Sequence, residues 1–495
     1  MKRCITPVYC IIAVIVGQII AFNIVSLPAQ LELVALISLL LFYPVFRYPK
    51  CGVYIIFFLM PFVPFFRRLY YLVYLRPDAD PLIILGDILT IFITTGLLFV
   101  FRKYSEDNNG LRVFTTVVLC YFIYVIFRTF VFNSNQLREG VLNLRFYAPQ
   151  VLMFFIGITF SKDFKMLKKL WLITFLIAFI TAMYGINQLF WGYSEAERIW
   201  FSSISFTSLF IEGMARPFST FQSPAAFADY LQLGIIAVLI LYSWSNSAKG
   251  KFFLLFIPLF FYGILITSVR SNWAGMVISL LVWFTILAVK GNKRRLAVLV
   301  VMILAYFGAQ FIQLGFEENP FLRSAPVVYS RMQERDYISM LVTDRIGALV
   351  NPFVEYSMVS RLALWRYVFA SSLNPLYAIL GRGTGTFSSD SIYFDYLAQF
   401  GYPGLLFIIS LIAAFIIYGI RLIDSSKDRS VIVLAKGITV FNITFAIINF
   451  TGTHIHSFPG DSYFWFWNGV LVSLYFSRNV NTDKAMGSDE NHGNA

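Results

Sequence analysis

Long apolar stretches dominate this sequence and restrict what it can fold into. A membrane-spanning helix needs roughly 20 consecutive apolar residues, and about fourteen segments here have that character. Charged residues make up 13% of the chain and hydrophobic residues 58%, against about 25% and 45–50% in ordinary soluble domains. The sequence therefore predicts an all-α polytopic membrane protein, with spans near residues 8–26, 31–46, 51–66, 82–101, 113–132, 146–160, 170–191, 223–244, 252–268, 272–289, 296–315, 401–420, 430–450 and 462–477.

Lysine and arginine divide between alternate loops. With a cytoplasmic N-terminus, every lysine in a predicted loop falls on the inside, and the outside loops carry arginine without lysine. Basic residues gather on the cytoplasmic side of membrane proteins, so this pattern predicts that both termini are cytoplasmic. The formal net charge of +13 then reflects topology, and nucleic acid is not an expected partner.

Arginine on the translocated side needs a reason. Its planar fork holds phosphate oxygens two at a time, so these residues are candidates for binding a phosphorylated substrate. The alternative is pairing within the loops, with acids such as Glu334, Asp336 and Glu355. Arg270 lies in a tight turn between two spans, where a cation is costly, and it is the strongest candidate for a functional cation rather than a snorkelling one.

The spans and loops divide the chain into four regions. Residues 1–315 are expected to form an N-terminal transmembrane bundle of about eleven helices, and residues 401–480 the C-terminal transmembrane helices. Residues 316–400 form the one long outside loop, and loops of this length are usually functional or disordered. Residues 481–495 are polar, which predicts a disordered cytoplasmic tail.

The long loop contains a helical pattern. Met358, Leu362, Trp365 and Phe369 recur at spacings of three or four residues, which predicts an amphipathic helix. Arg361 falls on nearly the same face as Trp365. Such a helix either lies on the membrane surface or packs against the outer ends of the spans.

Five outside segments combine arginine or glycine with small and aromatic residues. They are residues 139–147 with Arg145, residues 216–231 with Arg216, residues 268–275 with Arg270, residues 361–365 with Arg361, and residues 381–405 with Gly383, Gly385 and Asp390. Glycines allow the backbone to approach a ligand closely, and their amides can hold an anion.

These segments, in this order, resemble the bacterial O-antigen ligase and O-antigen polymerase family. The matching elements are an arginine before a TF…P…A…YL run at 216–231, S-x-R-x-x-W-x-G at 268–275, R-x-x-x-W at 361–365, G-x-G-x-F at 383–387 and H/D-N-x-Y-L…G-x-x-G-L at 390–405. The resemblance covers roughly residues 139–420. It implies a GT-C-like membrane fold with one large periplasmic loop.

The resemblance also implies a reaction. A glycan is transferred from a polyprenyl diphosphate carrier to a sugar hydroxyl at the periplasmic side of a lipid membrane. Arg270 and Asp390 are the catalytic residues that the resemblance implies, with Asp390 at the position of a base. The residues expected to bind the substrate are Arg145, Arg216, Arg361, Gly383 and Gly385. Neither a metal nor a cofactor is required.

Two positions differ from the family pattern, and one of them bears on whether the chain resembles a ligase or a polymerase. Family ligases typically carry histidine at the position of Asp390, and Ser391 replaces the usual asparagine. The reading favoured is therefore a surface polysaccharide polymerase of the bacterial inner membrane, with a chain-length regulator as a candidate partner. The alternative is a ligase that transfers the glycan to lipid A core or to protein. A different class, the lipid-linked oligosaccharide flippase, also has about fourteen spans.

Three further polar residues near span ends are candidates for chemistry. Asp229 lies within a predicted span, where an acid is by default a functional hypothesis, although it could simply pair with Arg216. His454 and His456 lie in an outside turn, either as solvated turn residues or as an alternative base.

Overall fold

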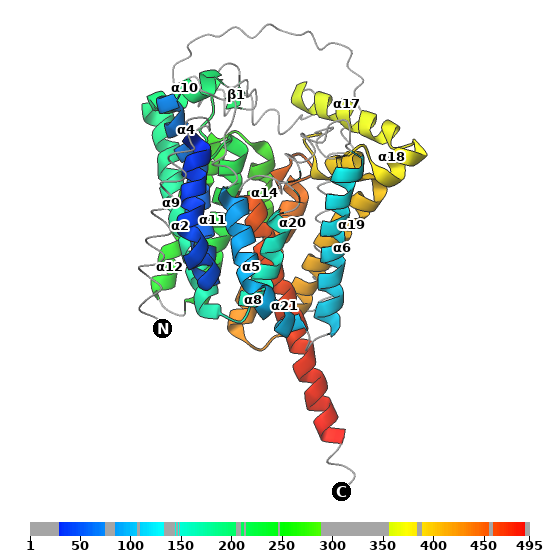
Figure 1. The fold of residues 1–495 in the computed structure, drawn as a ribbon. Coiled ribbons are helices and arrows are strands. Elements are labelled where there is room, and N and C mark those ends of the chain that lie inside the picture. The colour runs from blue at the N-terminus through cyan, green and yellow to red at the C-terminus, as the bar shows by residue number, and fades with distance from the viewer. Residues whose placement is uncertain are drawn as a thin grey trace.

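The computed structural model describes most of the chain as a helical bundle (Figure 1). The described residues are 29–74, 85–105, 109–132, 144, 147, 149–203, 209–211, 214–245, 248–288, 356–383, 389–454 and 459–490. The predicted spans 8–26 and 296–315, and residues 316–355 of the long loop, lie outside this set.

Helices make up nearly all of the described secondary structure. They are α2 (Ala29–Arg47), α3 (Pro49–Leu59), η2 (Met60–Phe62), α4 (Val63–Tyr74), α5 (Leu85–Ser105), α6 (Asn109–Phe132), η5 (Pro149–Val151), α8 (Leu152–Phe160), α9 (Phe164–Trp191), α10 (Glu195–Ser203), α11 (Pro224–Trp244), α12 (Ala248–Leu254), α13 (Ile257–Ile266), α14 (Arg270–Ala288), α17 (Tyr356–Ser371), α18 (Pro375–Leu380), α19 (Ile392–Ser425), α20 (Arg429–Ile448) and α21 (Gly460–Glu490). An antiparallel hairpin of β1 (Phe210–Ile211) and β2 (Met214–Ala215) joins α10 to the chain before α11.

Six helical segments within the described residues are long and apolar enough to cross a membrane. They are Pro49–Leu69, Asn109–Phe130, Phe164–Trp191, Pro224–Trp244, Ile392–Ser425 and Arg429–Ile448. Shorter apolar helices occupy Leu36–Arg47, Leu85–Leu97, Pro149–Phe160 and Gly250–Ile266, where the sequence predicts further spans. The chain is thus an all-α membrane protein.

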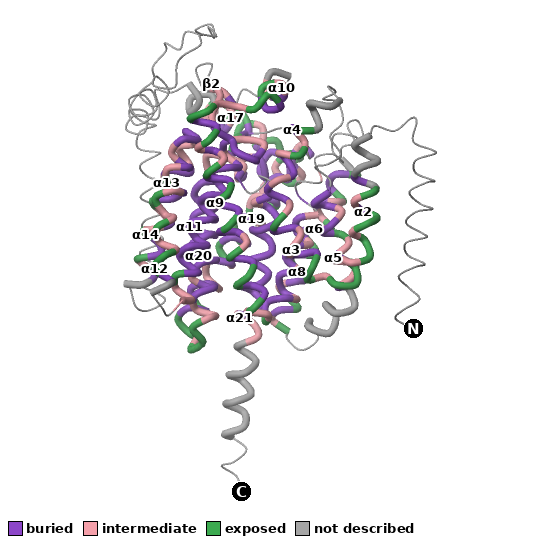
Figure 2. Tube along the Cα trace, turned by 90° about the vertical axis from the view of Figure 1, so that its left-hand side faces the viewer, coloured by how far each residue is buried: buried purple, intermediate pink, exposed green. Residues whose placement is uncertain are grey.

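The bundle has a buried centre and exposes apolar side chains on its outer helices. In α11 and α20, 89% and 78% of the most apolar window is buried, against 28% in α6. Figure 2 shows α11 and α20 mostly in the colour of buried residues, with exposed positions along α2, α5 and α6. Apolar side chains on these outer helices face outward, as in proteins that contact lipid.

Helix α12, which carries lysine, and the elements around the arginines predicted outside lie at opposite ends of the bundle. Some arginines, such as Arg429, which donates to the Ser243 carbonyl just before α12, lie at the lysine-bearing end as well. α12, which carries Lys249 and Lys251, lies at the same end as the C-terminus, whereas α10, β1 and α17 lie at the other (Figure 1). We call these the lysine end and the arginine end. At the lysine end, Lys50 Nζ lies 2.6 Å from Asp163 Oδ2. This hydrogen bond and that from the Met166 amide lower the pKa of Asp163.

Helix α19 bends at Gly401, where φ is +69°. The predicted span began at this residue, but the helix starts earlier, at Ile392. Pro403 has no N–H, so carbonyl groups at the bend need other donors. The carbonyl of Ala398 accepts from the Arg382 amide at 2.7 Å, and that of Gln399 accepts from the Gly383 amide at 3.1 Å.

Two other sequence predictions differ from the structure. In α17, Trp365 and Val368 are buried but Phe369 is 53% exposed, so the buried face is not the predicted 358–362–365–369 stripe. At the C-terminus, α21 continues to Glu490, where a disordered tail was predicted from residue 481. The tail contains good helix formers such as Lys484 and Ala485, which allow a polar segment to extend a helix.

Candidate functional site

The loop before α11 is fixed in place by a buried arginine. Arg68 of α4 is 1% exposed, and its guanidinium donates to the carbonyls of Ser219 at 2.7 Å and Phe221 at 2.9 Å. It also lies 4.7 Å from the centroid of the Phe218 ring, a favourable arrangement for a cation. Backbone carbonyls therefore occupy the side chain of Arg68, an arginine in a predicted outside loop.

A second side chain holds the same loop from the opposite direction. The Gln188 side-chain oxygen on α9 accepts from the amides of Phe218 at 3.1 Å and Ser219 at 2.7 Å. Ser219 has a φ of +53°, a conformation that costs free energy for a residue with a side chain. These contacts keep the loop in one conformation, and the Ser223 hydroxyl then caps α11 by accepting from the Ala226 amide.

The turn between α13 and α14 brings Arg270 to the start of a helix. Ser268 has a φ of +56°, and Arg270 is the first residue of α14. The Trp273 indole N–H donates to the carbonyl of Ile264 at 3.1 Å and so ties α14 to the end of α13. Gly275 lies where a side-chain carbon would overlap Ile448 of α20. Within the S-x-R-x-x-W-x-G pattern, tryptophan and glycine therefore pack the helices together.

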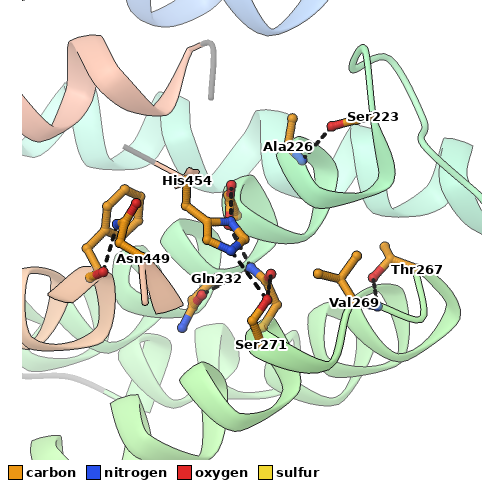
Figure 3. Close-up of polar contacts among 11 residues, drawn as sticks. Ser223, Ala226, Gln232, Thr267, Val269, Ser271, Asn449 and His454 are labelled. Carbon is orange, nitrogen blue, oxygen red and sulfur yellow. Dashed lines mark hydrogen bonds and ion pairs between the residues drawn. The ribbon is translucent and has the colours of Figure 1, made fainter. Parts of the chain in front are cut away.

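A buried carboxylate and a buried histidine meet beside this turn. Asp229 of α11 and His454 are both 4% exposed, and His454 Nδ1 lies 2.8 Å from Asp229 Oδ1. The other ring nitrogen, Nε2, lies 3.3 Å from the hydroxyl of Ser271 (Figure 3). Asn272 donates to Asp229 Oδ1 at 2.7 Å. We call these four residues the histidine cluster.

The histidine cluster continues into a buried polar network. Gln232 Oε1 lies 3.4 Å from Asn272 Nδ2, and Gln232 Nε2 donates to the Ser279 hydroxyl at 3.2 Å. Ser279 and Thr444 hydroxyls are 2.7 Å apart, which links α14 to α20. A satisfied network of this kind fixes the orientation of its members.

Two predicted arginines lie on the segments that form this cluster. Arg216 Nη1 lies 3.5 Å from the carbonyl of Thr267, so the segment before α11 contacts the turn that leads to Arg270. Arg270 directly precedes Ser271. Both arginines are partly exposed, and Arg216 directly follows β2. The predicted partnership of Arg216 with Asp229 differs from the structure, because the carboxylate of Asp229 contacts His454 and Asn272.

Two other predicted site residues, Arg361 and Asp390, contact each other, and no hydrogen bond or ion pair joins them to the histidine cluster among the described residues. Arg361 Nε is 3.6 Å from Asp390 Oδ2, and their side chains are 27% and 62% exposed. Asp390 has a φ of +54°. Its neighbour Ser391 contacts the carbonyl of Asn449 at 3.5 Å, so the two regions are connected through the turn that carries His454. Asp390 is thus an exposed ion-pair partner of Arg361.

The predicted glycine segment serves the fold at its described end. Gly383 has a φ of +106°, and its amide is bonded to the bend in α19. Arg382 donates to the Tyr367 hydroxyl at 2.9 Å and lies 4.9 Å from the centroid of that ring. Gly385 and Arg145 lie outside the described residues, as do His456 and Glu212.

Comparison with known protein families gave no matching family model, and comparison with characterised proteins gave no match either. The candidate site therefore stands on its geometry. Sequence reasoning identified Arg216 and Arg270 but ranked Asp390 above His454 as the base. It did not assign a role to Ser271 or Asn272, the two positions that follow Arg270 in the motif. The sequence signals for this site were an acid within a predicted span, Asp229, and a histidine in an outside turn, His454.

Proposed function

We propose that this protein is a glycosyltransferase of the bacterial inner membrane that polymerises a surface polysaccharide. It transfers a growing glycan from a polyprenyl diphosphate to a sugar hydroxyl of a lipid-linked repeat unit. The arginine end is then the periplasmic side, and the lysine end is cytoplasmic, in agreement with the usual distribution of basic residues. The fold in this proposal is GT-C-like, with about fourteen spans.

One observation carries this proposal. Arg216 and Arg270 lie on adjoining segments at the arginine end, and Arg270 directly precedes the residue that contacts the buried His454. Negative charge develops on a diphosphate as it leaves, and fixed arginine forks stabilise that charge. The first amides of α14 add positive potential at the same place.

The substrate is delivered in the membrane, which fits a site at the end of a transmembrane bundle. A polyprenyl chain is as apolar as the lipid around it, so the carrier can keep its tail in the bilayer beside the outer helices. The diphosphate then lies at the membrane surface, beside the partly exposed Arg216 and Arg270.

The test compares the surface glycan of a strain that lacks this protein with strains that express variants. In the deletion strain we expect single repeat units and no long chains. The Arg270→Ala and Arg216→Ala variants are expected to lower polymer formation by about 10²-fold each, the usual effect of removing a charge-stabilising group. Arg366→Ala, on the exposed face of α17, is the control and should leave polymer formation unchanged.

Two results would contradict the proposal. Long chains that persist on the polyprenyl carrier in the deletion strain would indicate a ligase. A full complement of surface polymer in the Arg270→Ala and Arg216→Ala strains would remove the site. Equal abundance of each variant in the membrane, measured by immunoblot, is required for the comparison.

A further inference from the structure

We infer that Ser271, His454 and Asp229 form a proton relay that receives the proton of the acceptor hydroxyl. The inference rests on the proposed function and assigns a base to it. The order of the groups is Ser271 Oγ, then His454 Nε2 at 3.3 Å, then His454 Nδ1 and Asp229 Oδ1 at 2.8 Å (Figure 3).

Hydrogen-bond chemistry sets the direction of the relay. An ionised carboxylate only accepts hydrogen bonds, so His454 carries a proton on Nδ1 and donates it to Asp229. In the neutral ring, Nε2 is then an acceptor. The Ser271 hydroxyl has two acceptors within reach, Nε2 at 3.3 Å and Asn272 Oδ1 at 3.4 Å. In the relay its proton is directed to Nε2, and its oxygen accepts a proton from a substrate hydroxyl.

Burial explains why a hydroxyl lies between the histidine and the substrate. The His454 side chain is 4% exposed, so a sugar hydroxyl does not reach the ring directly, whereas Ser271 is partly exposed. Ser271 is the second residue of α14 and directly follows Arg270. The relay requires that a substrate whose phosphate contacts Arg270 place its acceptor hydroxyl within hydrogen-bond reach of Ser271 Oγ.

Two further groups, Asn272 and Gly452, restrict the orientation of the His454 ring. Asn272 donates to the same oxygen of Asp229 that lies closest to His454, at 2.7 Å. On the other side of the ring, a side-chain carbon added at Gly452 would overlap His454 Nε2 and the adjacent ring carbon. The neighbouring chain thus fits closely around the imidazole, as expected where one ring position is required.

The step balances as a single displacement. The oxygen of the acceptor hydroxyl forms a bond to the anomeric carbon, and the bond from that carbon to the diphosphate oxygen breaks. The lipid diphosphate leaves with the bonding electron pair, beside Arg216 and Arg270. The acceptor proton moves to Ser271 Oγ as the serine proton moves to His454 Nε2, and Asp229 stabilises the resulting imidazolium. Release of that proton to water restores the site.

The experiment measures initial rates with the full-length protein in lipid nanodiscs. Its probe is the lipid-linked repeat unit extracted from a strain that lacks this protein. We expect His454→Gln and Ser271→Ala to lower kcat by about 10²–10⁴-fold, with KM for the lipid-linked unit changed less than about threefold, because the arginines that bind phosphate remain. Ser271→Thr retains a hydroxyl and should recover at least a tenth of the wild-type kcat.

Asp229→Asn tests the positioning residue. The amide keeps the shape of the side chain but can donate to Nδ1, which moves the ring proton to Nε2 and removes the acceptor. We expect a fall in kcat of at least about 10²-fold, in line with tautomer control in other histidine relays. Unchanged thermal unfolding of this variant would separate the loss of the relay from a loss of the fold.

Three outcomes overturn the relay. A wild-type kcat in His454→Gln or Ser271→Ala, measured alongside an inactive Arg270→Ala, would remove the relay but leave the proposed function intact. Wild-type activity in Arg270→Ala as well would remove the site of the proposed function. Covalent labelling of Ser271 by a fluorophosphonate would identify this residue as a nucleophile and contradict its role as a proton carrier.

Discussion

Two pairs of titratable side chains, Asp229 with His454 and Arg361 with Asp390, differ in how the fold holds them. The carboxylate of Asp229 and the ring of His454 are both 4% exposed and 2.8 Å apart, with Asn272 as an additional donor. Arg361 and Asp390 are 3.6 Å apart, and the Asp390 side chain is 62% exposed. A buried pair is stable only when every polar atom has a partner, so its geometry is tightly set. An exposed pair is weak and screened, so it positions little.

The supports of the two regions differ in the same way. The segment that leads to Asp229 is held by the buried Arg68 and by Gln188, which together bond four backbone groups. The segment that leads to Asp390 is held by Trp365, whose indole N–H donates to the carbonyl of Ser389 at 3.0 Å. Trp365 also stacks on Phe394, with ring centroids 4.9 Å apart. Substitutions at these supports should therefore have unequal effects.

The largest effect is expected from Arg68→Met. The apolar side chain fills part of the space but leaves the buried carbonyl of Phe221 without its donor, and that of Ser219 with only the Gln188 side-chain amide at 3.3 Å. An unsatisfied buried group costs about 1–3 kcal/mol and a hydrogen bond from a charged group contributes about 1.5–3 kcal/mol, so we expect the free energy of unfolding to fall by about 2–4 kcal/mol. Polymer formation should fall as well, because Arg216 and Asp229 flank this loop. Denaturant unfolding in detergent measures the first effect.

Arg366→Met serves as the control for Arg68→Met. This residue lies on the exposed face of α17, where substitutions usually change stability by less than about 0.5 kcal/mol. If both variants unfold at the same denaturant concentration as the wild type, Arg68 does not brace the loop. The close geometry of the histidine cluster would then have to depend on other contacts than those of Arg68.

A smaller effect is expected from Trp365→Phe. The ring still stacks on Phe394, but the hydrogen bond to the carbonyl of Ser389 is lost. We expect a loss of about 1–2 kcal/mol, the cost of one buried acceptor left without a partner. Tyr367→Phe is the matched control, since the hydroxyl it removes bonds the exposed side of Arg382. Equal stability of the two variants would contradict the role of the indole N–H in holding α17.

The sequence predicted the architecture better than the site. Apolar length and the separation of lysine from arginine indicated a helical membrane protein, because both follow from local composition. The start of α19 could not be read from hydropathy, since the bend at Gly401 depends on donors from residues 382 and 383, which are adjacent only in the folded chain. For the same reason, no sequence pattern indicated that Arg68 donates to the backbone carbonyls of residues 219 and 221.

The base was the hardest feature to predict. Asp390 was ranked first because it matched a family position, whereas the partner of His454 lies 225 residues away in sequence. Sequence spacing cannot indicate that α11 and the turn after α20 meet. Burial of both partners, which a sequence does not reveal, is the reason that the relay we propose uses His454 as the proton acceptor, while Asp390 stays an untested prediction.

The smallest effect should come from Asp390→Asn, and it tests the comparison most directly. Asparagine adopts positive φ more readily than most residues, so this variant removes the charge while it keeps the backbone conformation at φ +54°. Because the ion pair with Arg361 is largely exposed, we expect stability to change by less than about 1 kcal/mol. If His454 accepts the proton, kcat should change less than about threefold, whereas a base at Asp390 predicts a loss of about 10²-fold or more.

Asp390→Ala separates charge from conformation, because alanine should cost about 1 kcal/mol more at this φ. A large loss of kcat in Asp390→Asn, with normal unfolding, would indicate that Asp390 and not His454 accepts the proton.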